Sequence, residues 1–223
     1  MIMKLLIKAL IKYVIALVIV GMLLFLPAGT FNYLNAWLFI DLLFIPMFVL
    51  GTILYIKAPS LLEKRLNAKE EENTQKAVVA LSGALLILEF ILAGLDFRWG
   101  WSKMPFWLII VAAVLFLVFY VMYALIMKEN AYLSRKVEVQ ENQKVIDTGF
   151  YRLVRHPMYA VSLLMFLLIP VILGSWWSLV CFFPYSLVIV MRIKNEEKVL
   201  EANLLGYLEY KQRVKYRLIP FIW

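Results

Sequence analysis

The sequence predicts an all-α integral membrane protein with about six transmembrane helices, the last two forming a helical hairpin, and a polar cap at one end. Hydrophobic residues make up 64% of the 223 residues and charged residues 17%. Soluble domains are about half apolar and about a quarter charged. The mean hydropathy is +0.84. Together these values exclude a soluble enzyme, a disordered chain and a nucleic-acid-binding domain.

Long apolar runs account for the expected helices, because a helix needs about 20 apolar residues to cross a bilayer. Four runs meet this length: 5–26, 36–56, 77–95 and 104–127. A fifth apolar block, 158–191, is too long for one crossing and is interrupted at Leu173-Gly174-Ser175-Trp176. We therefore expect two short crossings there, 158–173 and 176–191.

The basic residues predict the orientation of these helices. Six crossings leave the N-terminus, 57–76, 128–157 and 192–223 on one side, and these segments hold 21 of the 23 Lys and Arg residues. The opposite loops hold only Arg98 and Lys103. Because basic residues accumulate on the cytoplasmic side, both termini and the cap are expected in the cytoplasm.

Without repeats or linkers, the chain is expected to form a single membrane domain, residues 1–223. Within it, 1–127 would supply the N-terminal transmembrane helices and 128–223 the cap with its helical hairpin. The charged stretch from Ser60 to Lys76 predicts a surface helix. Two acids, Asp41 and Glu89, fall within predicted crossings, where each is either a paired or protonated side chain or part of a functional path.

The rare residue types limit the chemistry further. Cys181 is the single cysteine and His156 the single histidine, which excludes an internal disulfide framework and a metal site built from several cysteines or histidines. We expect no metal ion.

The first cap segment contains a predicted helix start. Residues 137–146 alternate in polarity and are expected to be extended, and Thr148-Gly149 is typical of a turn. Pro157 suits the first turn of the next helix, since its missing N–H costs nothing there. Arg155, His156 and Tyr159 then surround a helix N-terminus, which favours a carboxylate or phosphate.

The second cap segment carries a charge pair. If the last crossing continues past the membrane, Arg192 and Glu196 lie one turn apart on one face. Such a pair can bind a zwitterion. The alternative is an arginine that extends to the membrane surface beside a solvated acidic turn.

Both segments together form a recognisable pattern. The first part is Gly149, Tyr151, Arg155-His156-Pro157 and Tyr159. The second part is Arg192, Glu196-Glu197, Leu200, Tyr207, Tyr210, Val214 and Ile219-Pro220. This pattern resembles the isoprenylcysteine carboxyl methyltransferase family, and phospholipid methyltransferases share much of it. The resemblance covers 128–223, whereas 1–127 match only in hydrophobic pattern.

The resemblance implies S-adenosylmethionine as methyl donor, held in a cytoplasmic pocket roofed by the C-terminal segment. Carried over residue by residue, the cofactor contacts would be Gln140, Gln143, Lys144, Val145, Ile146, Tyr151, His156, Pro157, Met158, Tyr159 and Glu196. Arg192 and Glu196 would be catalytic, with Arg192 facing the acceptor. Phe150, Ala160-Val161 and Gly206 depart from the family pattern, which bears on the identity of the acceptor more than on cofactor binding.

The expected activity is carboxyl O-methylation of an isoprenylcysteine-like or other lipophilic acceptor, with membrane lipid and no nucleic acid as partners. An ionised carboxylate needs no general base, and Arg192 can hold it. Three alternatives stay open: N-methylation of a phospholipid or other amine, an NADPH enzyme of the sterol-reductase type, and a non-enzymatic scaffold or transporter. An amine acceptor must lose a proton, which Glu196 or Glu197 can assist.

Overall fold

The computed structural model describes residues 2–66, 73–130, 132, 133 and 139–223, and the regular structure within these ranges is helical, with no strand. The elements are α1 (Ile2–Ala28), α2 (Leu34–Lys57), α3 (Pro59–Leu66), α4 (Asn73–Trp99), α5 (Phe106–Glu129), η1 (Gly149–Arg152), α6 (Pro157–Leu173), η2 (Ser178–Cys181), α7 (Phe182–Asn203) and α8 (Tyr207–Arg213).

Five of these helices are long and apolar enough to cross a membrane: α1, α2, α4, α5 and the helix that ends at Asn203. The predicted all-α membrane architecture is confirmed. The predicted final hairpin corresponds to α6, a shorter apolar helix, and α7. The two separate where Gly174 ends α6 in the left-handed conformation, with φ of 79°.

Helix α7 starts later and runs further than the predicted 176–191. Residues 178–181 first form the short 3₁₀ turn η2, and α7 then continues to Asn203. The extension forms because 192–203 contain no proline or glycine and are rich in Lys and Glu, which favour helix. As a result, the charged residues that follow the crossing stay on the same rigid helix as its apolar part.

Two other predictions were only partly right. The expected surface helix over 60–76 is shorter: α3 ends at Leu66, residues 67–72 lie outside the described part, and α4 already begins at Asn73. Within the expected extended stretch, residues 137 and 138 also lie outside the described part. The remainder is irregular and contains a turn at Glu141-Asn142, where Asn142 has φ of 57°. Asparagine tolerates this left-handed conformation, so the chain reverses there.

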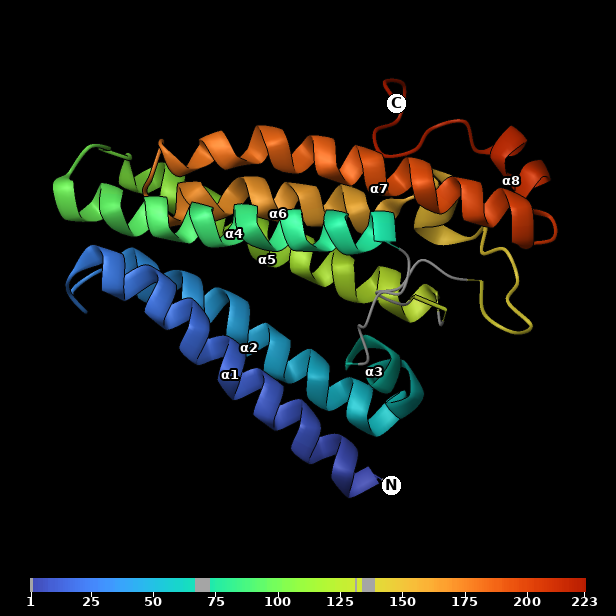
Figure 1. Ribbon diagram of the computed structural model, residues 1–223, viewed down its shortest axis with the longest axis horizontal. Helices are drawn as coiled ribbons and strands as arrows, with labels where there is room; N and C mark the ends of the chain where they lie inside the picture. The colour runs from blue at the N-terminus through green and yellow to red at the C-terminus, as the bar shows by residue number, and fades with distance from the viewer. Residues whose placement is uncertain (1, 67–72, 131, 134–138) are drawn as a thin grey trace.

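Helices α4, α5, α6 and α7 lie together along the molecule, whereas α1 and α2 diverge from them towards the end that carries both termini (Figure 1). The close approach of α1 to α4 depends on Gly94. A Cβ at this position would lie 2.7 Å from the Leu24 carbonyl oxygen of α1.

The end opposite the termini is held by a buried carboxylate. Asp96 accepts hydrogen bonds from the Ser102 backbone N–H at 2.7 Å and from the Ser102 and Ser175 hydroxyls, both at 2.5 Å. Asp96 thus ties the α4–α5 connection to the α6–η2 connection. With this end fixed, the other end of the four-helix group presents α7, α8 and the 139–156 segment side by side (Figure 1).

Candidate active site

A cavity of about 510 Å³ opens at the end of the molecule near α8. Small-molecule sites are typically clefts of about 300–1,000 Å³, so this one can hold a ligand of nucleoside size. Most of the residues carried over from the resemblance line it: 143–146, Tyr151, 156–159, Arg192 and Glu196. Two segments that are distant in sequence therefore meet around a single space.

Gln140 is the carried-over residue that does not line the cavity. Its side-chain amide donates to the Tyr132 carbonyl at 2.6 Å and its side-chain oxygen accepts from Lys64 at 2.5 Å. Its backbone N–H donates to the Gln143 side chain at 2.8 Å. Gln140 thus organises the loop that carries the 143–146 run.

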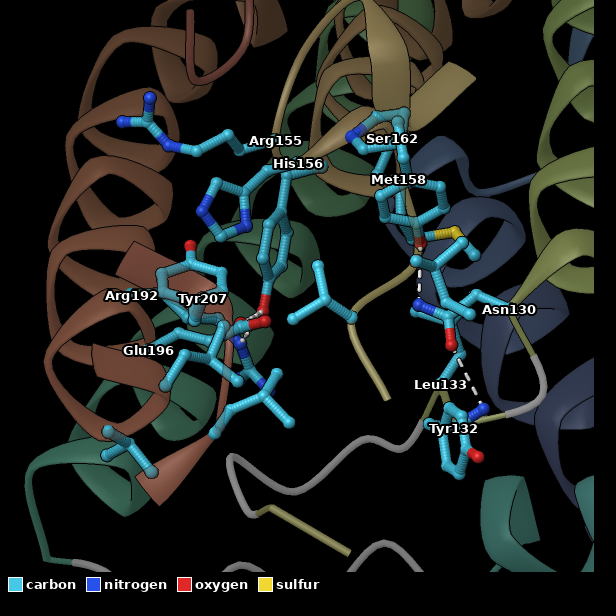
Figure 2. Close-up of a pocket in the computed structure, with 18 of the residues that line it drawn as sticks. Asn130, Tyr132, Leu133, Arg155, His156, Met158, Ser162, Arg192, Glu196 and Tyr207 are labelled. Carbon is cyan, nitrogen blue, oxygen red and sulfur yellow. Dashed lines mark hydrogen bonds between the residues drawn. The ribbon is translucent and has the colours of Figure 1, made fainter. Parts of the chain in front are cut away.

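Arg192, Tyr159 and Glu196 form one chain of hydrogen bonds inside the cavity. The Arg192 Nε donates to the Tyr159 hydroxyl at 2.8 Å, and this hydroxyl donates to the Glu196 carboxylate at 2.6 Å. The tyrosine of α6 therefore joins the cation and the anion of α7. Figure 2 shows Arg192, Glu196 and Tyr207 on one wall, across from Asn130, Tyr132 and Leu133.

The α7 face that lines the cavity is apolar at Ile189 and charged at Arg192 and Glu196. Tyr185, Ile189, Arg192, Glu196 and Leu200 follow one another at three- and four-residue steps, so they form one stripe. From Tyr185 to Glu196 this stripe is ~16 Å long at 1.5 Å per residue. The cavity therefore has a polar part near the cap and a more apolar part beside the crossing helices.

The N-terminus of α6 lies at the polar part of the cavity. Pro157 occupies the first turn, and the preceding His156 caps the helix without a side-chain hydrogen bond. Met158 and Tyr159 line the cavity and belong to the first turn, whose N–H groups have no acceptor within the helix. These groups and the helix dipole suit a carboxylate.

Glu197, the neighbour of Glu196, has a different role. It is 3% exposed, and its two oxygens accept from Arg155 Nε at 2.7 Å and Arg217 Nε at 2.8 Å. The His156 ring nitrogen is a further 3.3 Å from the same carboxylate. Glu197 does not line the cavity. Adjacent residues on a helix point about 100° apart, which explains how one acid faces the cavity and the other the structural cluster.

The Arg155-His156 segment is also joined to the C-terminal segment through the backbone. The Arg155 N–H donates to the Tyr216 carbonyl and the His156 N–H to the Arg217 carbonyl, both at 2.9 Å. The Arg155 guanidinium adds bonds to the carbonyls of Val214 at 2.7 Å and Lys215 at 2.8 Å. These contacts fix residues 214–217 against the start of α6.

Tyr151 and Gly149 position the adjoining wall. The buried Tyr151 hydroxyl accepts from the Asn130 side chain at 3.1 Å, and its carbonyl accepts from the Tyr210 hydroxyl at 2.8 Å. Gly149 has φ of 44°, and a Cβ there would overlap the Glu129 carboxylate. That carboxylate accepts from the Thr148 hydroxyl at 2.7 Å and the Phe150 N–H at 3.2 Å, so the predicted turn is held from α5.

Tyr207 is a cavity residue to which sequence reasoning gave no role. It is 4% exposed, and its hydroxyl has no hydrogen-bond partner within the described part of the chain. Burial raises the pKa of this phenol well above its ordinary value, so it remains a hydrogen-bond donor. A buried hydroxyl without a partner is costly unless a ligand or water satisfies it. The sequence showed Tyr207 as part of the family pattern, but it could not show that the Tyr207 hydroxyl has no hydrogen-bond partner in the described part of the chain.

The two acids within the crossings do not enter the site. Glu89 is fully buried, and neither carboxylate oxygen has a hydrogen-bond partner among the described residues. It does not line the cavity. Asp41 is exposed on the outside of α2.

Comparison with known proteins identifies the segment that holds most of this geometry. Residues 103–204 match the sequence profile of the phospholipid methyltransferases. The resemblance, expected over 128–223, is confirmed for 128–204. The profile belongs to the isoprenylcysteine carboxyl methyltransferase-like superfamily. Within the segment that matches the phospholipid methyltransferase profile lie the Arg192–Tyr159–Glu196 chain and the N-terminus of α6, whereas Tyr207, Arg217 and α3 lie outside it.

A curated relative is similar over a comparable length. The chain is 31% identical over 96 residues to the uncharacterized protein YpbQ of Bacillus subtilis (strain 168). The match covers 43% of this chain and 57% of YpbQ, so the chain spans little more than half of that relative.

Proposed function

We propose that the protein is an integral membrane methyltransferase that transfers a methyl group from S-adenosylmethionine to a lipophilic acceptor. The first candidate reaction is carboxyl O-methylation. The observation that carries this proposal is the Arg192–Tyr159–Glu196 chain in a cavity at a helix N-terminus, within the phospholipid methyltransferase segment. Residues 128–223 would then form the catalytic region of one membrane domain.

The polar groups of the cavity suit the methyl donor, which carries an amino acid head, a sulfonium and an adenosine. The first-turn N–H groups of Met158 and Tyr159 can bind the carboxylate of the head. Glu196 can accept from the ammonium or the ribose. The unpaired Tyr207 hydroxyl is a further donor for a ligand oxygen.

The residues of the chain act by positioning. The methyl donor supplies an electrophilic methyl carbon on sulfur, and transfer breaks its C–S bond as a C–O bond forms, leaving a neutral thioether and, from a carboxylate, a neutral ester. No proton moves in this reaction. Arg192 would fix the angle of the attacking carboxylate, and holding reactants in line supplies much of the rate.

N-methylation of a phospholipid amine is the second candidate, favoured by the description of the matched family. Such an acceptor has to lose a proton. Glu196 faces the cavity and is the acid placed to assist this loss, whereas Glu197 is occupied by Arg155 and Arg217 and does not line the cavity.

We also propose that the cavity lies on the cytoplasmic side. The cavity lies at the end of the molecule to which α3, α8 and both termini belong. The segments at this end contain most of the basic residues, and basic residues accumulate on the cytoplasmic side of membranes.

Replacing Glu196 by Ala is expected to reduce methyl transfer by about tenfold or more, because a hydrogen bond to a charged group contributes about 1.5–3 kcal/mol. The measurement is incubation of detergent-purified protein with labelled S-adenosylmethionine and a membrane lipid extract, followed by mass spectrometry of the labelled product. Glu209→Ala, an exposed acid on α8, is the matched control and should retain activity. Absence of label with the wild-type protein would count against the proposed activity.

Replacing Tyr207 by Phe is expected to weaken binding of S-adenosylhomocysteine by about two- to tenfold, the value of one hydrogen bond. The thermal unfolding midpoint should not fall, because this hydroxyl has no protein partner in the described part of the chain. In Tyr210→Phe, which loses the bond to the Tyr151 carbonyl, the midpoint should fall instead. Calorimetric titration and thermal unfolding in detergent measure the two quantities, and unchanged affinity in Tyr207→Phe would remove this residue from the site.

A further inference from the structure

Arg65 of α3 lies at the cavity, although α3 belongs to the N-terminal half of the chain and outside the phospholipid methyltransferase segment. Its side chain is half-buried, and its guanidinium donates to the Tyr123 hydroxyl of α5 and lies 5.6 Å from the centre of that ring. The end of α3 is fixed from α1, where Lys12 donates to the Leu66 carbonyl at 2.5 Å. Arg65 is therefore a positioned cation.

The cavity that Arg65 lines also carries apolar and hydroxyl-bearing side chains from four long helices. These are Val79, Ser82, Tyr123, Ser162, Tyr185 and Ile189. Val79 lines the cavity and is 44% exposed on α4, so the cavity reaches the surface that faces lipid. An apolar chain can therefore extend from the cavity towards the membrane.

The charge of Arg65 bears on which ligand head group the cavity favours. A guanidinium cannot be deprotonated in a protein, and a charge removed from water is costly unless it is paired. Among the described residues, Arg65 forms no ion pair with a carboxylate. Arg192, a second guanidinium on the same cavity, is joined through Tyr159 to Glu196. The charge of Arg65 therefore favours an anion and disfavours a cationic amine as the bound head group.

We propose that Arg65 and the hydroxyl groups of this cavity form an acceptor subsite for an amphiphile whose head group is an anionic carboxylate or phosphate. This inference rests on the proposed function and adds the substrate class to it. The apolar lining and the opening at Val79 favour an anion attached to an aliphatic chain over a free inorganic anion. Acceptor choice would then depend on α3, outside the segment that carries the cofactor contacts.

The test compares head groups on one aliphatic chain. Purified protein in excess dodecyl maltoside, a neutral amphiphile, is titrated calorimetrically with dodecyl phosphate, dodecyltrimethylammonium and inorganic phosphate. The same titrations are made with Arg65→Gln, with the charge-conserving Arg65→Lys, and with Lys57→Gln. Lys57 is the matched control because it is basic and exposed, ends the neighbouring helix α2 and does not line the cavity. S-adenosylhomocysteine is titrated into every variant.

Dodecyl phosphate is expected to bind wild-type protein and Lys57→Gln, to bind Arg65→Gln about tenfold or more weakly, and to bind Arg65→Lys with intermediate affinity. Dodecyltrimethylammonium and inorganic phosphate should not bind measurably. The affinity for S-adenosylhomocysteine should stay the same in all variants. Equal binding of dodecyl phosphate by wild-type protein and Arg65→Gln overturns the subsite, as does binding of inorganic phosphate as tight as that of dodecyl phosphate. Failure of S-adenosylhomocysteine to bind, with the Arg65 effect retained, instead counts against the proposed function and leaves the anion site.

Discussion

Replacing Arg192 by Ala is expected to reduce the rate of methyl transfer by roughly a hundredfold or more, while binding of S-adenosylhomocysteine changes little. Arg192 contacts the Tyr159 hydroxyl and faces the cavity between its polar and apolar parts, so its loss releases both the tyrosine and the acceptor. Displacement of a reacting group by about 1 Å can by itself cost about a hundredfold in rate.

The experiment measures the initial rate of label transfer to the lipid extract alongside calorimetric titration of S-adenosylhomocysteine. Arg192→Lys is the informative companion, because lysine keeps the charge but loses the planar fork of the guanidinium. We expect an intermediate rate for it. A large loss of S-adenosylhomocysteine affinity with an unchanged rate would place Arg192 in the cofactor site.

Replacing Glu197 by Ala is expected to destabilise the protein by about 3–5 kcal/mol, the cost of breaking a buried ion pair and leaving its partner charge uncompensated. The Arg155 and Glu197 side chains are both 3% exposed, and Arg217 and His156 share the same carboxylate. The effect should spread to the C-terminal segment, since Arg155 also holds the carbonyls of Val214 and Lys215.

Thermal unfolding in detergent, followed by tryptophan fluorescence, measures this loss. Glu201→Ala is the control on the same helix, because its ion pair with Lys211 is about a third exposed on each side and such pairs contribute at most about 1 kcal/mol. If the two variants had equal unfolding midpoints, Glu197 would not be the residue that joins α7 to the C-terminal segment.

The helices were predictable because their formation depends on local properties. Apolar length predicted the long crossings, and Gly174 marked the division of the 158–191 block. Pro157 marked the start of α6 in the same way. The boundaries of α7 were less predictable, since the sequence was divided by polarity at residue 191 while helix formation depends on propensity and continues to Asn203.

The partners of the polar side chains were not predictable, because they depend on contacts across long sequence separations. Tyr159 and Glu196 are 37 residues apart and share a hydrogen bond. Sequence spacing placed Arg192 and Glu196 on one face but could not reveal that Tyr159 lies between them. Likewise, Glu196 and Glu197 were interchangeable as candidate proton acceptors until the structure showed Glu197 in contact with Arg155, Arg217 and His156.

The roles of Arg65 and Tyr207 were not predictable from the sequence either. The charged stretch around Arg65 suggested a solvated helix face, and only the approach of α3 to α5 places this guanidinium at the cavity. Tyr207 stood within a recognised motif, yet its significance lies in the lack of a partner for its hydroxyl in the described structure.

The proposed function depends on binding of the methyl donor in the cavity. Calorimetric titration of the purified protein with S-adenosylhomocysteine, and in parallel with NADPH, tests this binding directly. We predict one-to-one binding of S-adenosylhomocysteine, weakened about tenfold or more in Glu196→Ala and unchanged in Glu209→Ala, with no heat from NADPH. Binding of NADPH alone, or S-adenosylhomocysteine affinity that Glu196→Ala leaves intact, would contradict the proposal that the 143–159 and 192–207 segments hold one methyl donor between them.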